Sequence, residues 1–499
     1  PDSSWLSLSD EEMISRELPS ARLSVPAVAA VAVLGLAVLS GTVIGSGQAA
    51  ARPLNEASLI VGAAIVLLVS LSRLGLGVAL VPVVAAAVPF ELSTGTDSPI
   101  VAGLMFVALL LGVWLLRALA GRDLRIVRSP VVVPCIGLVV VWIFAFLYSD
   151  VDVSPSVWNW DRFTLPRLGG LAVVLLSIGA LLLALNVGRN RRWIRLATWS
   201  FLGLSVVGIV GIYLDDPAFG FLATGGLFTM WAVALAYGQA LFNERLSRLA
   251  RAGLLALTVA WLFQAIVLET IWFSGWVPSV IALAVITFFR SKRTFAMLVL
   301  GVAIAVALNW GRVYQALWTA KIQEGDYNRP SVWQQALQVA EQHPLLGTGP
   351  AGYMAYYRSV YANSPFSSLS SHSNYVDVVA ETGIVGTAVF AWFMVSLLVV
   401  GWRAHRRWRS SFEGGFAQAT LGGLLGLMVA MALGDWFIPF VYNQTIAGFR
   451  YTVQSWIFLG FLASLAAVQG DFEDDVDGSL DRRRQLEYPG APAQLSHVD

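Results

Sequence analysis

The fold is organised around a long polar interval between two apolar segments, and its informative parts read RPSVWQQALQVAEQHPLLGTGPAG (residues 329–352) and HSNYVDVVAETGIVG (residues 372–386). Elsewhere only a few polar residues separate the hydrophobic runs. Within residues 309–389 about sixty residues intervene, which is too long for a simple connection. Its many aromatic side chains argue against disorder; they include Trp318, Trp333, Tyr353, Tyr356, Tyr357 and Tyr361. We therefore predict a folded loop that carries the function.

Local patterns in this interval predict short helices joined by a glycine-rich turn. Ser331 opens a capping box and is expected to be the N-cap of a helix that continues to Gln342. Pro344 stops that helix, because the residue before a proline avoids helical geometry. The next residues, 347–352, have the spacing of a dinucleotide fingerprint, but no strand precedes them and Pro350 lacks an N–H donor. We read them as a turn whose backbone amides could face a phosphate.

The chain as a whole has the composition of an integral membrane protein. Of its 499 residues 57% are hydrophobic and 13% are charged, and the mean hydropathy is +0.70. The formal net charge of +1 argues against a nucleic-acid partner. Cys135 is the only cysteine, so a disulfide framework and a cysteine metal site are excluded. We predict neither a metal nor a cofactor.

Apolar runs long enough to cross a bilayer recur along the chain and predict about fourteen transmembrane helices. The first is expected at residues 25–44, and the others have centres near Val66, Val83, Leu109, Val140, Val174, Gly203, Ala232, Ala260, Ala284, Val302, Ala391, Leu425 and Leu459. The predicted fold is an all-α membrane protein with one long structured extracytoplasmic loop before the third-last helix. Its parts are a cytoplasmic segment (1–24), a bundle of about eleven spans (25–311), the active-site loop (312–376), the last three spans (377–468) and an acidic, disordered tail (469–499).

Basic residues cluster in alternate connections and orient the spans by the positive-inside rule. The predicted cytoplasmic connections contain Arg117, Arg122, Arg125 and Arg128; Arg189, Arg191, Arg192 and Arg195; Arg245, Arg248 and Arg251; Arg290, Lys292 and Arg293; and Arg403, Arg406, Arg407 and Arg409. The intervening connections are acidic or neutral. Counting spans from these clusters places both termini in the cytoplasm and the long loop outside.

The ordered motifs of the loop resemble the signature of the O-antigen ligase and polymerase superfamily of membrane glycosyltransferases. The elements that carry the resemblance, between residues 329 and 386, are Arg329, Trp333, HPLLGTG (343–349), HSNY (372–375) and ETGIVG (381–386). Members usually have asparagine directly after the histidine, where this chain has Ser373. The resemblance implies a multi-pass protein of the bacterial plasma membrane.

The resemblance and the chemistry of the loop single out a small set of site residues. By resemblance His372 is the general base, a role that suits a group titrating near neutral pH; a hydrogen-bonded loop histidine is the structural alternative. Arg329 and Arg312 are expected to bind a diphosphate. The supporting residues are Asn374, Tyr375, Asp377 and Glu381. Asp377 and Glu381 share one helix face, and we favour a solvated helix cap over an acid–base pair.

The function implied by the resemblance is glycan transfer on the outer face of the membrane. The donor would be a glycan linked to undecaprenyl diphosphate, and the acceptor would be a hydroxyl of a glycan or lipid. A repeat-unit polymerase and a protein-glycosylating transferase of the same superfamily use the same donor chemistry and remain alternatives. A polysaccharide flippase, from another class, would need matched halves, and we find no internal repeat.

Overall fold

The structure is a computed structural model that describes residues 73–94, 98–121, 126–154, 157, 160–215, 222, 224–268, 273–311, 314–315, 329–360 and 371–467. Several predictions fall outside these residues: the N-terminal segment 1–24, the first two spans, most of the loop before Arg329, and the tail 469–499. Arg312, one of the two predicted diphosphate ligands, is also outside them.

Within the described residues the chain is almost entirely helical, and every predicted apolar centre in them lies in a helix. These helices are α3 (Leu74–Ala87), α4 (Ala102–Ala120), α5 (Val132–Tyr148), α6 (Thr164–Val187), α7 (Arg191–Leu214), α8 (Phe228–Phe242), α9 (Arg248–Phe263), α10 (Phe273–Arg290), α11 (Lys292–Leu308), α15 (Asn374–Arg407), α16 (Phe412–Leu433) and α18 (Phe449–Ala467). A two-stranded ribbon joins β1 (Glu91–Leu92) to β2 (Ile100–Val101). The helical fold class is confirmed.

Not all of these helices are long enough to cross a bilayer unaided. In the described ranges six are long and apolar enough by themselves: α4, α6 with the 3-10 turn Trp160–Phe163, α7, α9 with the π turn Gln264–Leu268, α15 and α16. Helices α3, α5, α8 and α10 are shorter and apolar. The predicted total of about fourteen spans is therefore not confirmed.

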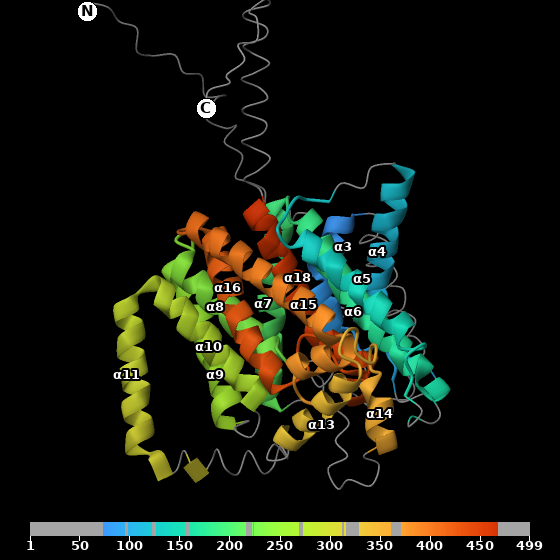
Figure 1. Cartoon of the computed structure of the whole chain (residues 1–499). Coiled ribbons are helices and arrows are strands. Elements are labelled where there is room, and N and C mark those ends of the chain that lie inside the picture. The colour runs from blue at the N-terminus through green and yellow to red at the C-terminus, as the bar shows by residue number, and fades with distance from the viewer. Residues whose placement is uncertain are drawn as a thin grey trace, which may run out of the picture.

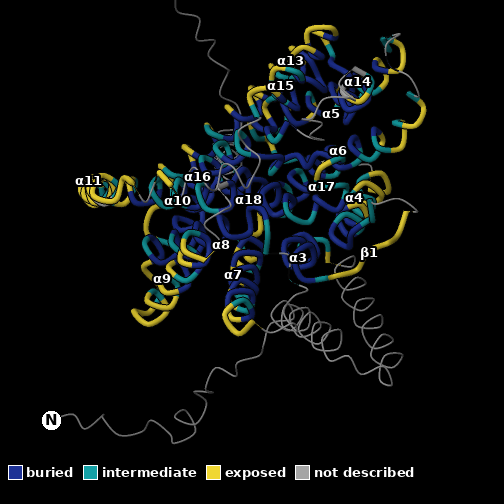
Figure 2. The backbone as a smooth tube through the Cα atoms, turned by 90° about the horizontal axis from the view of Figure 1, so that it is seen from below, coloured by how far each residue is buried: buried dark blue, intermediate teal, exposed yellow. Residues whose placement is uncertain are grey.

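Helices α6, α8, α16 and α18 form the interior of the bundle, and α10 packs on α16 and α8 (Figure 1). Small residues let the backbones approach closely. A Cβ atom on Gly460 of α18 would lie 2.4 Å from the carbonyl oxygen of Leu181, and one on Gly426 of α16 would lie 2.5 Å from that of Pro278. By contrast α11 stands apart, and its apolar side chains are exposed (Figure 2), as expected for a helix that faces lipid.

The arginine-rich connections gather at one end of the bundle. The contacts that join them are Val127 to Asn186 (2.9 Å), Arg195 to Glu413 (2.6 Å), Gln239 to Phe412 (3.0 Å), Phe289 to His405 (ring centroids 4.1 Å apart) and Trp408 to Leu465 (3.4 Å). Helix α15 has 34 residues and runs from this end of the bundle to the other. The described residues 329–360 and 371–376 of the polar interval therefore lie at the end opposite the arginines.

That opposite end holds the short helices α13 (Arg329–Gln342) and α14 (Tyr353–Val360), beside the start of α15 (Figure 1). The short helix α17 (Val441–Gln444) packs against α6. Helix α13 ends at Gln342, as predicted. The prediction that Ser331 is its N-cap is wrong, because the helix is already formed at Arg329. Pro330 accounts for the earlier start, since proline suits the first helical turn, where its missing N–H is not needed.

Candidate active site

The two motif regions of the sequence meet at a break in α15. Gly383 has φ 61° and ψ −162°, which interrupts the helix and frees backbone groups on both sides of it. The turn after α13 docks into this break. Thr348 N donates to Ala380 O (3.0 Å), Gly349 N donates to Glu381 O (3.0 Å), and Ile384 N donates to Pro344 O (2.9 Å). HPLLGTG and ETGIVG are thus two halves of one joint.

This joint overturns the expectation that amides of the glycine-rich turn face a phosphate. The amide of Gly347 donates to His343 O within the turn (3.0 Å). Those of Thr348 and Gly349 donate to α15, and Ala351 N donates to Glu381 Oε1 at 2.7 Å. These donors already have partners, so they hold the turn in place.

His372 lies directly before α15, half-buried, in the left-handed conformation with φ 52°. This conformation is uncommon outside glycine, although histidine is among the residues that adopt it more often. The residues on both sides are fixed by buried hydrogen bonds. Trp333 Nε1 donates to Ser371 O (2.8 Å), and Ser373 N donates to Ser371 Oγ (3.1 Å). These hydrogen bonds therefore hold the backbone of residues 371–373 in place.

Asn374 and Tyr375 fasten the start of α15 to the segment that follows α16. The amide of Asn374 donates to Ile438 O (2.6 Å) and accepts from Phe437 N (2.9 Å). Tyr375 donates its hydroxyl to Met428 O at 2.8 Å. The structure therefore gives both predicted supporting residues anchoring contacts.

Asp377 and Glu381 are buried, so the prediction of a solvated helix cap is wrong. Each is only 4% exposed, because α14 and residues 435–441 cover this face of α15. Asp377 Oδ1 accepts from the hydroxyls of Tyr353 (3.0 Å) and Ser371 (2.6 Å). The periodicity correctly placed both carboxylates on one face, but that face meets protein.

Asp435 adds a third buried carboxyl group to this cluster. It follows the end of α16, is 1% exposed, contacts Asp377, and accepts a hydrogen bond from Asn443 (2.9 Å). Burial, together with the negative charges of Asp377, Asp435 and Glu381, raises the pKa of Tyr353 well above its usual value. The Tyr353 hydroxyl therefore stays protonated and can donate to Asp377.

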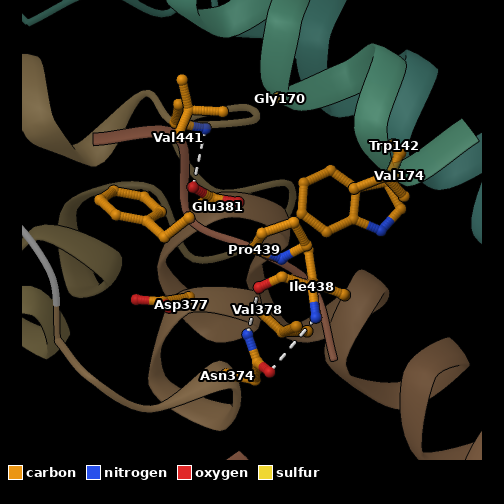
Figure 3. A pocket seen from close by; sticks show the side chains of 12 residues that line it. Trp142, Gly170, Val174, Asn374, Asp377, Val378, Glu381, Ile438, Pro439 and Val441 are labelled. Carbon is orange, nitrogen blue, oxygen red and sulfur yellow. Dashed lines mark hydrogen bonds between the residues drawn. The ribbon is translucent and has the colours of Figure 1, made fainter. Parts of the chain in front are cut away.

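A small cavity of about 10 Å³ lies beside these groups (Figure 3). Its wall includes Trp142, Asn374, Asp377, Glu381 and Pro439. Such a volume holds about one water molecule and no sugar ring. His372 is half-buried and is not among the residues that line this cavity.

Arg329 lies at the C-terminal end of α16. Its Nη1 donates to Leu433 O at 2.9 Å, a favourable position because the last carbonyls of a helix carry partial negative charge. Arg358 lies over the Tyr442 ring, 5.4 Å from its centroid. The structure thus brings His372, Asn374, Tyr375, Asp377 and Glu381 together at the start of α15 and places Arg329 on the neighbouring end of α16.

Arg167 is a buried cation at this end of the bundle that sequence analysis missed. It is fully buried, donates to Asp150 Oδ1 (2.6 Å), Phe146 O (3.0 Å) and Ser149 Oγ, and lies 4.3 Å from the Trp160 ring. The only signal in the sequence was a charge at the start of an apolar run. Burial alone would raise the pKa of Asp150, but hydrogen bonds from Arg167 and Trp160 and the charge of Arg167 outweigh it and lower that pKa.

His343 occupies a second buried cluster, away from His372. Its Nδ1 bonds to Asp152 Oδ2 (2.9 Å), and its ring meets Tyr356 edge-on with centroids 4.7 Å apart. These contacts agree with the structural role expected for a histidine before a helix-stopping proline. Among the described residues no group of three or more His, Cys, Asp or Glu side chains could hold a metal ion.

Part of the chain matches a known protein family. Residues 246–391 match a family model described as O-antigen ligase; they extend from the connection before α9 into α15 and include Arg329 and His372. The comparison with curated proteins found no match. The match confirms the resemblance predicted from the ordered motifs and supports assignment to the O-antigen ligase superfamily.

Proposed function

From its assignment to the O-antigen ligase superfamily, we propose that this chain is a membrane glycosyltransferase that moves a glycan from undecaprenyl diphosphate to an acceptor hydroxyl. The observation that carries the proposal is His372. It lies in the matched segment and is half-buried, with an uncommon backbone conformation, and its neighbour Ser371 is hydrogen-bonded to the buried Tyr353 and Asp377. Unusual backbone conformations persist where the surroundings over-determine them, and they concentrate at functional sites.

The proposed chemistry is a displacement at the anomeric carbon of the donor sugar. The acceptor oxygen forms a bond to that carbon while its proton passes to His372. The bond from the carbon to the diphosphate oxygen breaks, and the electron pair leaves with the lipid diphosphate. Cationic groups stabilise the charge that develops on the leaving group, and we assign this role to Arg329 and Arg312.

The proposed orientation follows from the two ends of the bundle. The arginine-rich connections mark the cytoplasmic end by the positive-inside rule. His372 and α13 lie at the other end, and we therefore propose that the site faces the outer side of the plasma membrane and that both termini are cytoplasmic. Lipid-linked glycans are expected to reach His372 from that side.

The proposal is tested with purified protein in liposomes, a fluorescent oligosaccharide linked to undecaprenyl diphosphate as donor, and two alternative acceptors. A lipid acceptor that gains one glycan identifies a ligase, whereas a donor glycan that grows by repeat units identifies a polymerase. Transfer by the unaltered chain and its loss in His372→Ala support the proposal. Absence of transfer to either acceptor, combined with movement of intact donor across the bilayer, would favour the flippase.

A further inference from the structure

The hydroxyl group of Tyr353 joins the buried carboxylates to the backbone beside His372. It accepts a hydrogen bond from Ser371 N (3.0 Å) and donates one to Asp377 Oδ1 (3.0 Å). The side chain is 2% exposed, and its ring stacks on Phe440 with centroids 5.0 Å apart and an interplanar angle of 17°. Ring stacking and two hydrogen bonds leave this hydroxyl little freedom to move.

The same network continues to the other side of His372. Ser371 Oγ lies 2.6 Å from Asp377 Oδ1 and accepts from Ser373 N at 3.1 Å. Ser371, before His372, bonds to Tyr353 and Asp377, and Ser373, after His372, bonds to Ser371. Both neighbours of His372 therefore belong to the network of Tyr353 and Asp377. Because the backbone on both sides of His372 is fixed, the network sets the direction in which the side chain of His372 leaves the backbone.

We propose that Tyr353 is a positioning residue for His372, and that its hydroxyl fixes the left-handed turn that presents the imidazole to the acceptor. This inference rests on the proposed function, because it assigns to Tyr353 an effect on the reaction through His372. Asp377 is the partner in this task, since it accepts from both Tyr353 and Ser371.

Tyr356 provides a matched control on the same helix. It is also buried, at 1% exposure, and its hydroxyl also bonds to backbone, donating to Asp152 O (3.1 Å) and accepting from Ser154 N (3.3 Å). Those partners belong to the connection after α5. Tyr353→Phe and Tyr356→Phe therefore each remove one buried hydroxyl from α14, but only the first breaks a bond to the segment that carries His372.

Turnover is the first measurement. Tyr353→Phe should lower kcat roughly tenfold to hundredfold with little change in KM for the donor, because small displacements of a catalytic group have effects of this size. Tyr356→Phe should keep kcat near that of the unaltered chain, even if it lowers Tm as much as Tyr353→Phe does. In a His372→Ala background, Tyr353→Phe should reduce the residual turnover no further, since it acts through the missing imidazole.

Chemical labelling of His372 is a measurement that needs no substrate. The rate at which diethylpyrocarbonate modifies His372, followed by peptide mass spectrometry with His405 as internal reference, should rise in Tyr353→Phe and stay constant in Tyr356→Phe. An unchanged labelling rate in Tyr353→Phe would overturn the positioning role. So would a Tyr353→Phe substitution that lowers turnover by the same factor in the presence and in the absence of the His372 side chain. If His372→Ala kept full turnover while labelling responded as expected, the proposed function would fail and the structural link would stand.

Discussion

Gly347 and Gly383 interlock where the glycine-rich turn enters the break in α15. A Cβ atom on Gly347 would lie 2.4 Å from the backbone carbon of Glu381, and one on Gly383 would lie 2.5 Å from the backbone carbon of Leu345. Both glycines also have positive φ, at 66° and 61°. Glycine is therefore required at each position for two reasons. Its backbone has positive φ, and the backbone of the other segment of the joint comes too close to leave room for a Cβ atom.

Replacement of Gly383 by alanine should destabilise this joint strongly. Glycine is essentially the only residue that adopts φ 61° with ψ −162°, so another residue there costs about 1–3 kcal/mol, and the contact with Leu345 forces a backbone shift in addition. We expect a lower Tm in detergent and loss of transfer. Gly253→Ala is the control, because nothing lies within 4 Å of a Cβ atom there; it should leave Tm unchanged or slightly raised. A Gly383→Ala protein with the Tm of the unaltered chain would contradict the interlock.

Replacement of His372 and replacement of His343 should have different effects. His372→Ala should retain its fold and donor binding but lose about 10²–10⁴-fold in turnover, the usual effect of removing a general base. His343→Ala breaks the bond to Asp152 and the ring contact with Tyr356, so it should lower stability by about 1–3 kcal/mol. Turnover, donor binding and Tm are measured on both variants. Near-normal turnover in a stable His372→Ala protein would refute the role of general base.

Arg329 should not tolerate lysine. Its guanidinium already donates through Nη1 to Leu433 O, and a lysine cannot keep that bond and also present a planar pair of donors to a diphosphate. We expect Arg329→Lys to lose roughly tenfold to hundredfold in kcat/KM, the equivalent of one charge-assisted hydrogen bond. Arg358→Ala, which removes a cation over Tyr442, should have a smaller effect. Full activity in Arg329→Lys would exclude a bidentate role.

The ion pair of Asp150 with Arg167 should make stability depend on pH in the acid range. The pKa of Asp150 is lowered in the folded chain, so its contribution is present above the unfolded-state pKa of about 3.9 and is lost as pH falls through the folded-state value. Asp150→Asn should cost about 1 kcal/mol at pH 7, a figure reduced because the carboxylate is 51% exposed. The difference in Tm between the two proteins should shrink below about pH 4; a constant difference would argue against the ion pair.

The proposed orientation is tested with single cysteines in a Cys135→Ala background. Glu341→Cys on α13 and Ser410→Cys after α15 place thiols on exposed positions at opposite ends of the bundle. A membrane-impermeant maleimide added to intact cells should label the first and spare the second. The reverse pattern would invert the topology and move the site to the cytoplasmic side.

The helices could be predicted from the sequence because the length and apolar character of each run depend only on its own residues. It could not place Asp377 and Glu381 correctly, because the cover over them comes from α14 and from residues 435–441, which are distant along the chain. The break at Gly383 was missed for a related reason. A glycine inside an apolar run predicts only a weaker helix. The break at Gly383 depends on the docking of residues 344–349, which precede it by more than thirty residues in the chain.

The bond of Asn374 to Phe437 constrains how the protein is made. These partners are 63 residues apart in the sequence, so the clamp cannot close until α16 and the segment after it have left the ribosome. At ordinary elongation speed the turn at His372 is therefore without this clamp for about 3–13 s. A chain truncated after α15 would be inserted without ever completing its site.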